Sequence, residues 1–90
     1  MTERTATRKV FVKVNSDFDT TGYMQPRSIT WLDGRYFPID AVRDCRPVSD
    51  HPERSCYTII IKGEEKRLYF DRSEPLYASC CGRWWVETAS

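Results

Sequence analysis

The stretch Ile29-Thr-Trp-Leu-Asp-Gly-Arg-Tyr-Phe-Pro-Ile39 decides the fold class, because two apolar runs flank an Asp-Gly pair. Asp-Gly between apolar residues is one of the strongest signals that a single sequence gives for a β-hairpin. The stretch therefore predicts short antiparallel strands joined by a tight turn. No phosphate-binding loop or metal-binding spacing lies within it.

Two registers of this hairpin differ in the face that becomes apolar. A loop formed by Asp33-Gly34 pairs Leu32 with Arg35, whereas a loop that also contains Leu32 pairs Trp31 with Arg35. We favour the longer loop, with Gly34 left-handed in a bulge, because a slip of one residue would turn the apolar face to solvent. In this register one face carries Ile29, Trp31, Phe37 and Ile39.

Outward from the hairpin, the sequence alternates between apolar runs and polar segments. The runs predict strands at 9–14, 40–47, 57–61, 67–70 and 84–86, separated by loops at 15–27, 48–55 and 71–82. No stretch has a helical period. We therefore expect an all-β fold, a small single-domain barrel or strongly coiled antiparallel sheet of about five to six strands, SH3-like or an OB-like variant. Residues 1–7 read as a flexible N-terminal arm and 8–88 as the domain.

The predicted core takes the inward-facing residues of these strands. Val10, Val12 and Val14 share one face of the first strand. The expected core residues are Val10, Val12, Ile29, Trp31, Phe37, Ile39, Val42, Ile59, Ile61, Leu68 and Phe70.

Composition restricts the classes of function. The 90 residues carry 14 basic and 13 acidic side chains, a net charge of +1, which argues against binding nucleic acid mainly by counterion release. No apolar run is long enough to span a bilayer, and the N-terminus lacks the apolar segment of a secretory signal. We therefore expect a cytoplasmic protein.

The cysteines and the histidine are the candidate ligands of a metal site. They are also the candidate nucleophile and general base of a catalytic site. Cys45, Cys56 and the adjacent Cys80-Cys81 form no Cys-x-x-Cys knuckle, and His51 lies between Asp50 and Pro52 in a polar segment. We expect reduced thiols, because cytosolic redox buffers maintain them. The sequence thus predicts no metal, no cofactor and no catalytic residues.

Binding potential is greatest at the tryptophan pair near the C-terminus. Adjacent strand residues face opposite sides, so one of Trp84 and Trp85 is expected in the core and the other outside. An exposed indole beside arginine would stack nucleobases or anchor a protein. In the alternative, loop 71–82 covers the ring. The predicted binding residues are Arg83, Trp84, Trp85, Tyr69 and Tyr36.

A set of turn and core residues spread over most of the chain forms a recognisable pattern: Ile29-Thr-Trp, Asp33-Gly-Arg35, Ile39-Asp, Val42, Asp44, Arg46, Tyr57-Thr, Leu68, Phe70, Gly82-Arg-Trp84 and Val86-Glu87. With this pattern the chain resembles a family of small uncharacterised proteins of gut Firmicutes, which are often encoded beside a Y-family, error-prone DNA polymerase. An actinobacterial family with the same neighbourhood is more distantly similar. The chain departs from the pattern at Tyr36, Pro38 and Cys80-Cys81. The resemblance implies a role near translesion synthesis or mobile-element maintenance, and it supplies no catalytic residues.

Together these observations predict a small adaptor without enzymatic activity. Its expected partner is a protein, with a DNA polymerase as a candidate. The alternative is a single-stranded nucleic-acid binding module that uses Arg83, Trp85 and Tyr69 together with the basic N-terminal arm. Measuring binding at two salt concentrations separates the two functions, because nucleic-acid binding weakens steeply with salt.

Overall fold

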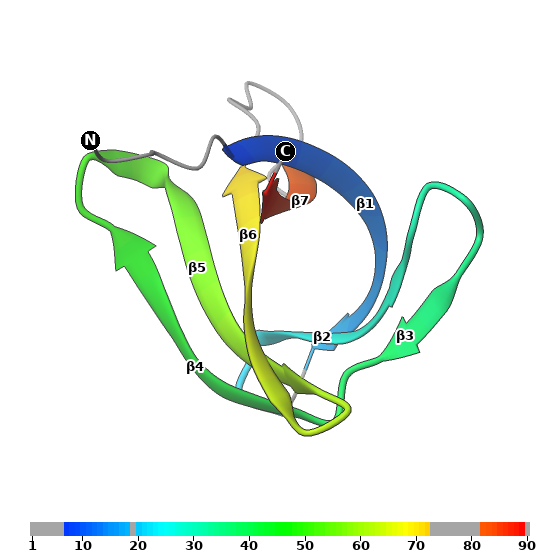
Figure 1. Ribbon diagram of the computed structural model, residues 1–90. Coiled ribbons are helices and arrows are strands. Elements are labelled where there is room, and N and C mark those ends of the chain that lie inside the picture. Colours follow the sequence, from blue (N-terminus) through cyan, green and yellow to red (C-terminus); the bar gives the residue numbers. More distant parts are fainter. Residues whose placement is uncertain (1–6, 19, 73–81, 90) are drawn as a thin grey trace.

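The structure, a computed structural model, describes residues 7–18, 20–72 and 82–89. These residues form seven strands of one antiparallel sheet, which curls into a half-barrel (Figure 1). The strands are β1 (Thr7–Phe18), β2 (Met24–Thr30), β3 (Tyr36–Pro38), β4 (Ala41–Val48), β5 (His51–Ile61), β6 (Glu64–Arg72) and β7 (Gly82–Ala89).

The all-β prediction and the strongly coiled sheet are confirmed, with more strands than the five to six expected. No helix that could cross a membrane occurs in the described ranges. Most of the expected N-terminal arm lies outside the described residues, and β1 begins at Thr7.

The sheet curls because its two outermost strands follow each other in the chain. The strand order is β3-β2-β1-β7-β6-β5-β4, so β3 and β4 lie at opposite ends of the sheet. Between them, the Ile39 N–H donates to the Arg27 carbonyl at 2.9 Å, and the Asp40 N–H donates to the Ile60 carbonyl at 2.8 Å. The backbone thus changes partner from β2 to β5 within two residues, which brings the two ends of the sheet together.

The hairpin of β2 and β3 adopts the favoured register. Ile29 lies opposite Phe37, the Trp31 N–H donates to the Arg35 carbonyl at 2.8 Å, and the Gly34 N–H donates to the Trp31 carbonyl at 2.9 Å. Gly34 has φ +92°, the left-handed conformation that such a loop requires at its last position. The longer loop is therefore confirmed.

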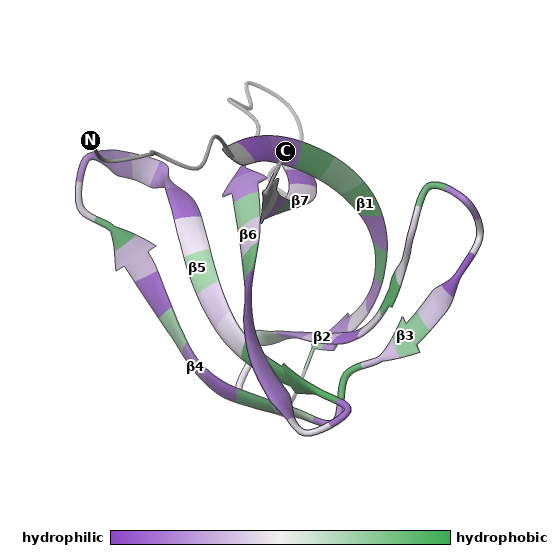
Figure 2. Cartoon of the chain, in the orientation of Figure 1, coloured by the Kyte–Doolittle hydropathy of each residue, from purple (hydrophilic) through white to green (hydrophobic). Residues whose placement is uncertain are grey.

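The core lies on the inner, concave face of the sheet. Hydrophobic residues along β4 are separated by hydrophilic ones (Figure 2), and the half-buried residues of this outermost strand are Val42 and Val48. The centre of the core is Ile29, Tyr57, Ile59, Ile61, Leu68 and Trp84, with half-buried residues packed around it.

Most of the predicted core is confirmed. Val10, Ile29, Ile59, Ile61 and Leu68 are buried, and Val12, Phe37, Ile39, Val42 and Phe70 are half-buried against them. Trp31 is half-buried rather than enclosed. The structure adds Tyr57, Trp84 and Trp85 to the expected core residues, of which the sequence predicted one of the two tryptophans to be in the core without deciding which.

Two of the predicted loops are wrong, because polar segments of the sequence form strands instead of irregular structure. Residues 15–27 belong largely to a hairpin in which β1 continues to Phe18 and β2 starts at Met24. A bulge between Asn15 and Ser16 admits Pro26 opposite Ser16, which a regular ladder would not tolerate. Likewise 48–55 is mostly strand, since Val48 pairs with His51 across a tight turn. Polar side chains there lie on exposed parts of paired strands, so their hydropathy resembles that of a loop.

Candidate functional site

The tryptophan pair occupies both faces of β7, as strand alternation predicts. Trp84 points inward, where its ring centroid lies 4.7 Å from that of Phe70 and 5.3 Å from that of Tyr57. Trp85 lies opposite Tyr69 across the β6–β7 pair and is stacked on it at 4.3 Å. Trp84 is therefore the inward ring and Trp85 the outward one.

The expectation that one indole is exposed is wrong, and most of loop 71–82, the alternative cover for the ring, lies outside the described residues. Trp85 is only 4% exposed and Trp84 only 9%. The Lys9 Nζ lies 4.5 Å from the Trp85 ring centroid and the Arg54 Cζ lies 4.8 Å from it. Long cationic side chains thus cover the outer ring with their stems and bring their charges to its π-face. Sequence alternation assigns a side of the sheet but does not show what packs over that side.

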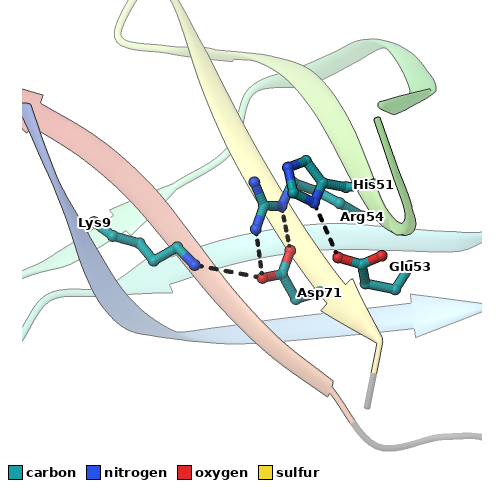
Figure 3. Close-up of polar contacts among 5 residues, drawn as sticks. All are labelled: Lys9, His51, Glu53, Arg54 and Asp71. Atoms are coloured by element: carbon teal, nitrogen blue, oxygen red, sulfur yellow. Dashed lines mark hydrogen bonds and ion pairs between the residues drawn. The ribbon is translucent and has the colours of Figure 1, made fainter. Parts of the chain in front are cut away.

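An aspartate holds these two cations in place (Figure 3). The Arg54 Nε and Nη2 donate to the two Asp71 carboxylate oxygens at 2.8 and 3.2 Å, and the Lys9 Nζ lies 3.6 Å away. Burial of the carboxyl raises its pKa, but Arg54, Trp85 and Lys9 together outweigh burial and hold the pKa of Asp71 below its ordinary value. Asp71, Arg54, Lys9, Trp85 and Tyr69 form a connected assembly, the outer-face stack.

The other predicted binding residues are divided between two places. The Arg83 Cζ lies 3.8 Å from the ring centroid of Phe11, which pairs with Trp85, so Arg83 shares the outer face. Tyr36 is 63% exposed on β3 and pairs with Thr30. The structure therefore brings together Arg83, Trp85 and Tyr69, with Trp84 on the opposite face and Tyr36 on the separate hairpin.

A groove that the sequence analysis did not predict opens where β6 and β7 diverge. Its volume is about 530 Å³. Apolar side chains of Ile59, Ile61 and Val86 line it together with Trp31 and Phe37 of the β2–β3 hairpin. The sequence signal for this groove is Trp31, an aromatic residue at the end of a strand beside a turn. The sequence pattern places Trp31 in the core, whereas in the structure it is half-buried and lines the groove.

Charged side chains surround the groove, and some of its cations form ion pairs with neighbouring acids. Arg35 lies 2.8 Å from the Asp33 carboxylate, and Lys66 lies 3.3 Å from that of Glu64. Lys62 and Arg67, which also line the groove, form no ion pair with another residue in the described ranges. Two cations without an ion-pair partner among the described residues therefore lie on β6 and in the turn before it.

An acid occupies the opposite wall of the groove. Glu87 of β7 lines it and likewise forms no ion pair with a described residue. The groove thus has a cationic wall on β6 and an anionic wall on β7.

The thiols and the histidine do not assemble a site in the described part of the chain. Cys45 is exposed and Cys56 half-buried, both with free thiols, and Cys80 and Cys81 lie outside the described residues. The His51 Nδ1 lies 3.4 Å from the Glu53 carboxylate, so an acid is the partner of its ring. Among the described residues no three potential ligands gather as a metal site would need.

No protein-family model matches the chain, and neither a curated protein nor a solved structure matches it. The groove and the outer-face stack are the features of the molecule that bear on its function.

Proposed function

We propose that this chain is a non-enzymatic binding module of the cytoplasm whose partner is a protein, and that the groove between β6 and β7 is its binding site. The observation that carries the proposal is the aromatic lining: Trp31 and Phe37 are half-buried and line a mainly apolar groove of about 530 Å³. Concave, mainly apolar sites with a few polar groups at the rim are typical of binding surfaces.

The charges favour a protein over a nucleic acid. A single-strand binder needs a cationic track for the phosphates and aromatic faces open to the bases. Here Arg35 and Lys66 are neutralised by neighbouring acids, and Glu87 would repel phosphate from the opposite wall. At the outer-face stack, a base would have to displace Lys9 or Arg54 before it could reach Trp85.

The resemblance to proteins encoded near Y-family polymerases makes such a polymerase the first partner to test. We expect a purified Y-family polymerase from the same host to bind the full chain in calorimetry, with affinity that changes little with salt. Oligodeoxythymidine is the competing probe. Binding of the oligonucleotide alone, with steep loss at higher salt, would support the nucleic-acid function instead.

Two variants on the same hairpin locate the binding surface. Trp31→Leu removes the aromatic ring that lines the groove while keeping an apolar side chain, and we expect it to weaken binding by about tenfold or more. Tyr36→Leu is the matched control, because Tyr36 is 63% exposed and does not line the groove. Loss of binding in Tyr36→Leu with normal binding in Trp31→Leu would place the site elsewhere.

A further inference from the structure

The β6 strand has an incomplete set of strand partners. It pairs with β5 from Glu64 to Asp71, but with β7 only from Tyr69 to Arg72. Over Glu64–Leu68, therefore, the side of β6 that faces away from β5 has no strand partner in the described part of the chain. An unpaired strand edge presents a row of backbone N–H and C=O groups that can accept another strand.

The same divergence leaves space for an added strand. Beyond Trp85, β7 continues to pair with β1 as far as Ala89, but no longer with β6. The groove lies between these separated segments, with Lys66 and Arg67 on one wall and Val86 and Glu87 on the other. An extended peptide in this wedge would lie beside the free edge of β6.

The inward and outward faces of β6 differ in chemistry along Glu64–Leu68. This difference determines which side chains an added peptide strand would need on each of its faces. Strand residues alternate between faces, and Leu68 and Lys66 face inward with Tyr57 and Ile59, which they oppose on β5. Lys66 and Glu64 form an ion pair with each other on this face, and the rest of the inward lining includes Ile59, Ile61, Trp31 and Phe37. Alternate residues of an added strand would enter this apolar space.

The outward side favours acidic residues. Arg67 lies on the outer face of β6, opposite Thr58, and forms no ion pair with a described residue. Lys62 lines the same groove at the β5–β6 turn. Glu87 faces outward on the opposite wall and would repel an acidic side chain there, but Lys62 and Arg67 outnumber it. A carboxylate that the peptide places on the β6 side of the groove would therefore complement both cations.

We propose that the free edge of β6, Glu64–Leu68, takes an extended segment of a partner protein as an added antiparallel or parallel strand, in which apolar residues alternate with acidic ones. Main-chain hydrogen bonds then supply affinity, and the alternating side chains supply specificity. This inference rests on the proposed function and specifies how the partner is bound. The charge-mixed run Glu64-Glu-Lys-Arg67 would discourage indiscriminate pairing with apolar strands.

The test is a titration of isotope-labelled full-length protein with a short end-blocked peptide of alternating valine and glutamate, followed by backbone amide chemical shifts. We expect shifts at Glu64–Leu68 and at the facing residues Val86–Thr88. The peptide of alternating valine and lysine should bind about tenfold more weakly or not at all. Absence of shifts at millimolar peptide, or equal binding of the lysine peptide, would overturn the proposal.

Backbone methylation separates strand addition from simple groove filling. Two further peptides carry N-methyl groups on the valine amides or on the glutamate amides, each removing the donors from one edge of the strand. We expect at least one of them to lose about tenfold in affinity, because an added strand depends on the edge that it presents. If both bind as the parent does, strand addition is wrong although the groove still binds a peptide, and the proposed function stands.

Arg67→Glu and Lys13→Glu form the matched pair of protein variants. Both replace an exposed cation on a strand by glutamate, but Lys13 is on β1 and does not line the groove. Arg67→Glu should weaken the valine–glutamate peptide by about tenfold, and Lys13→Glu should leave binding within about twofold. Equal weakening by both would show a general effect of charge and overturn the assigned edge. Shifts at this edge with oligodeoxythymidine but not with the peptide would refute both the proposed function and this inference.

Discussion

Replacement of Trp85 by alanine tests whether the outer indole is buried, as in the structure, or exposed to solvent, as the sequence suggested. An outer indole left in water would cost little to remove. In the structure Trp85 is 4% exposed, stacked on Tyr69 at 4.3 Å and covered by Lys9 and Arg54. We therefore expect Trp85→Ala to be strongly destabilising.

The magnitude follows from burial. A tryptophan buries about 150–250 Å², which at about 25 cal/mol per Å² corresponds to about 4–6 kcal/mol. Alanine keeps part of this burial, so a loss of about 3–5 kcal/mol is expected, as for other aromatic-to-alanine changes. For a domain of this size, each kcal/mol lowers the melting temperature by about 4–8 °C, so the midpoint should fall by about 12–40 °C.

The assay is urea and thermal unfolding followed by far-ultraviolet circular dichroism, with Tyr36→Ala as the control. Tyr36 is 63% exposed, and its replacement should change the free energy of unfolding by no more than about 0.5 kcal/mol. If Trp85→Ala also stays within about 0.5 kcal/mol of the parent, the indole is not buried under the cations and the outer-face stack is wrong.

Three further predictions concern a close backbone approach, the buried carboxylate and the thiols. Gly82→Ala should lower stability by about 1–3 kcal/mol in urea unfolding, because an added Cβ would overlap the Phe70 ring and lie 2.7 Å from the Asp71 carbonyl oxygen; an unchanged midpoint would contradict the close approach of β6 and β7. Since the pKa of Asp71 is lowered in the folded state, its carboxylate contributes stability above about pH 4, and this is lost as the pH falls through the folded-state pKa. The free energy of unfolding should therefore fall less with decreasing pH in Asp71→Asn than in the parent protein. The same fall in both proteins would show that Arg54 does not hold the carboxylate. Thiol titration of the denatured, unreduced protein should find 4 free groups and elemental analysis no stoichiometric zinc, whereas unfolding by a chelator would reveal a structural metal.

Local sequence was sufficient to predict the structure wherever a short pattern of residues restricts the backbone directly. Gly34 permits the left-handed last position of the hairpin loop, and the apolar residues on either side admit one register that buries them together. The β-branched run at 57–61 likewise forms the C-terminal end of β5, a strand paired on both sides. These features depend on neighbours within a few residues, so they could be predicted.

The polar hairpins could not be predicted in the same way. Pro26 and the residues around His51 lie in paired strands because partner strands supply hydrogen bonds there, and no hydropathy pattern records that pairing. The β1–β2 pair continues beyond its bulge to Phe18 and Met24, which the polar composition of this segment does not indicate.

The sequence by itself determined an all-β chain, the hairpin register, most of the core, and the opposite facing of Trp84 and Trp85, because alternation and turn chemistry are local properties of the backbone. Only the tertiary structure decided that Trp85 is covered, since Lys9 and Arg54 reach it from strands far apart in sequence and are held there by Asp71. It also decided the groove, which exists because Glu64–Leu68 of β6 stay paired with β5 while the end of β7 beyond Trp85 stays paired with β1. The two strands therefore diverge on the N-terminal side of Tyr69 and on the C-terminal side of Trp85. Both features depend on how distant strands meet in space.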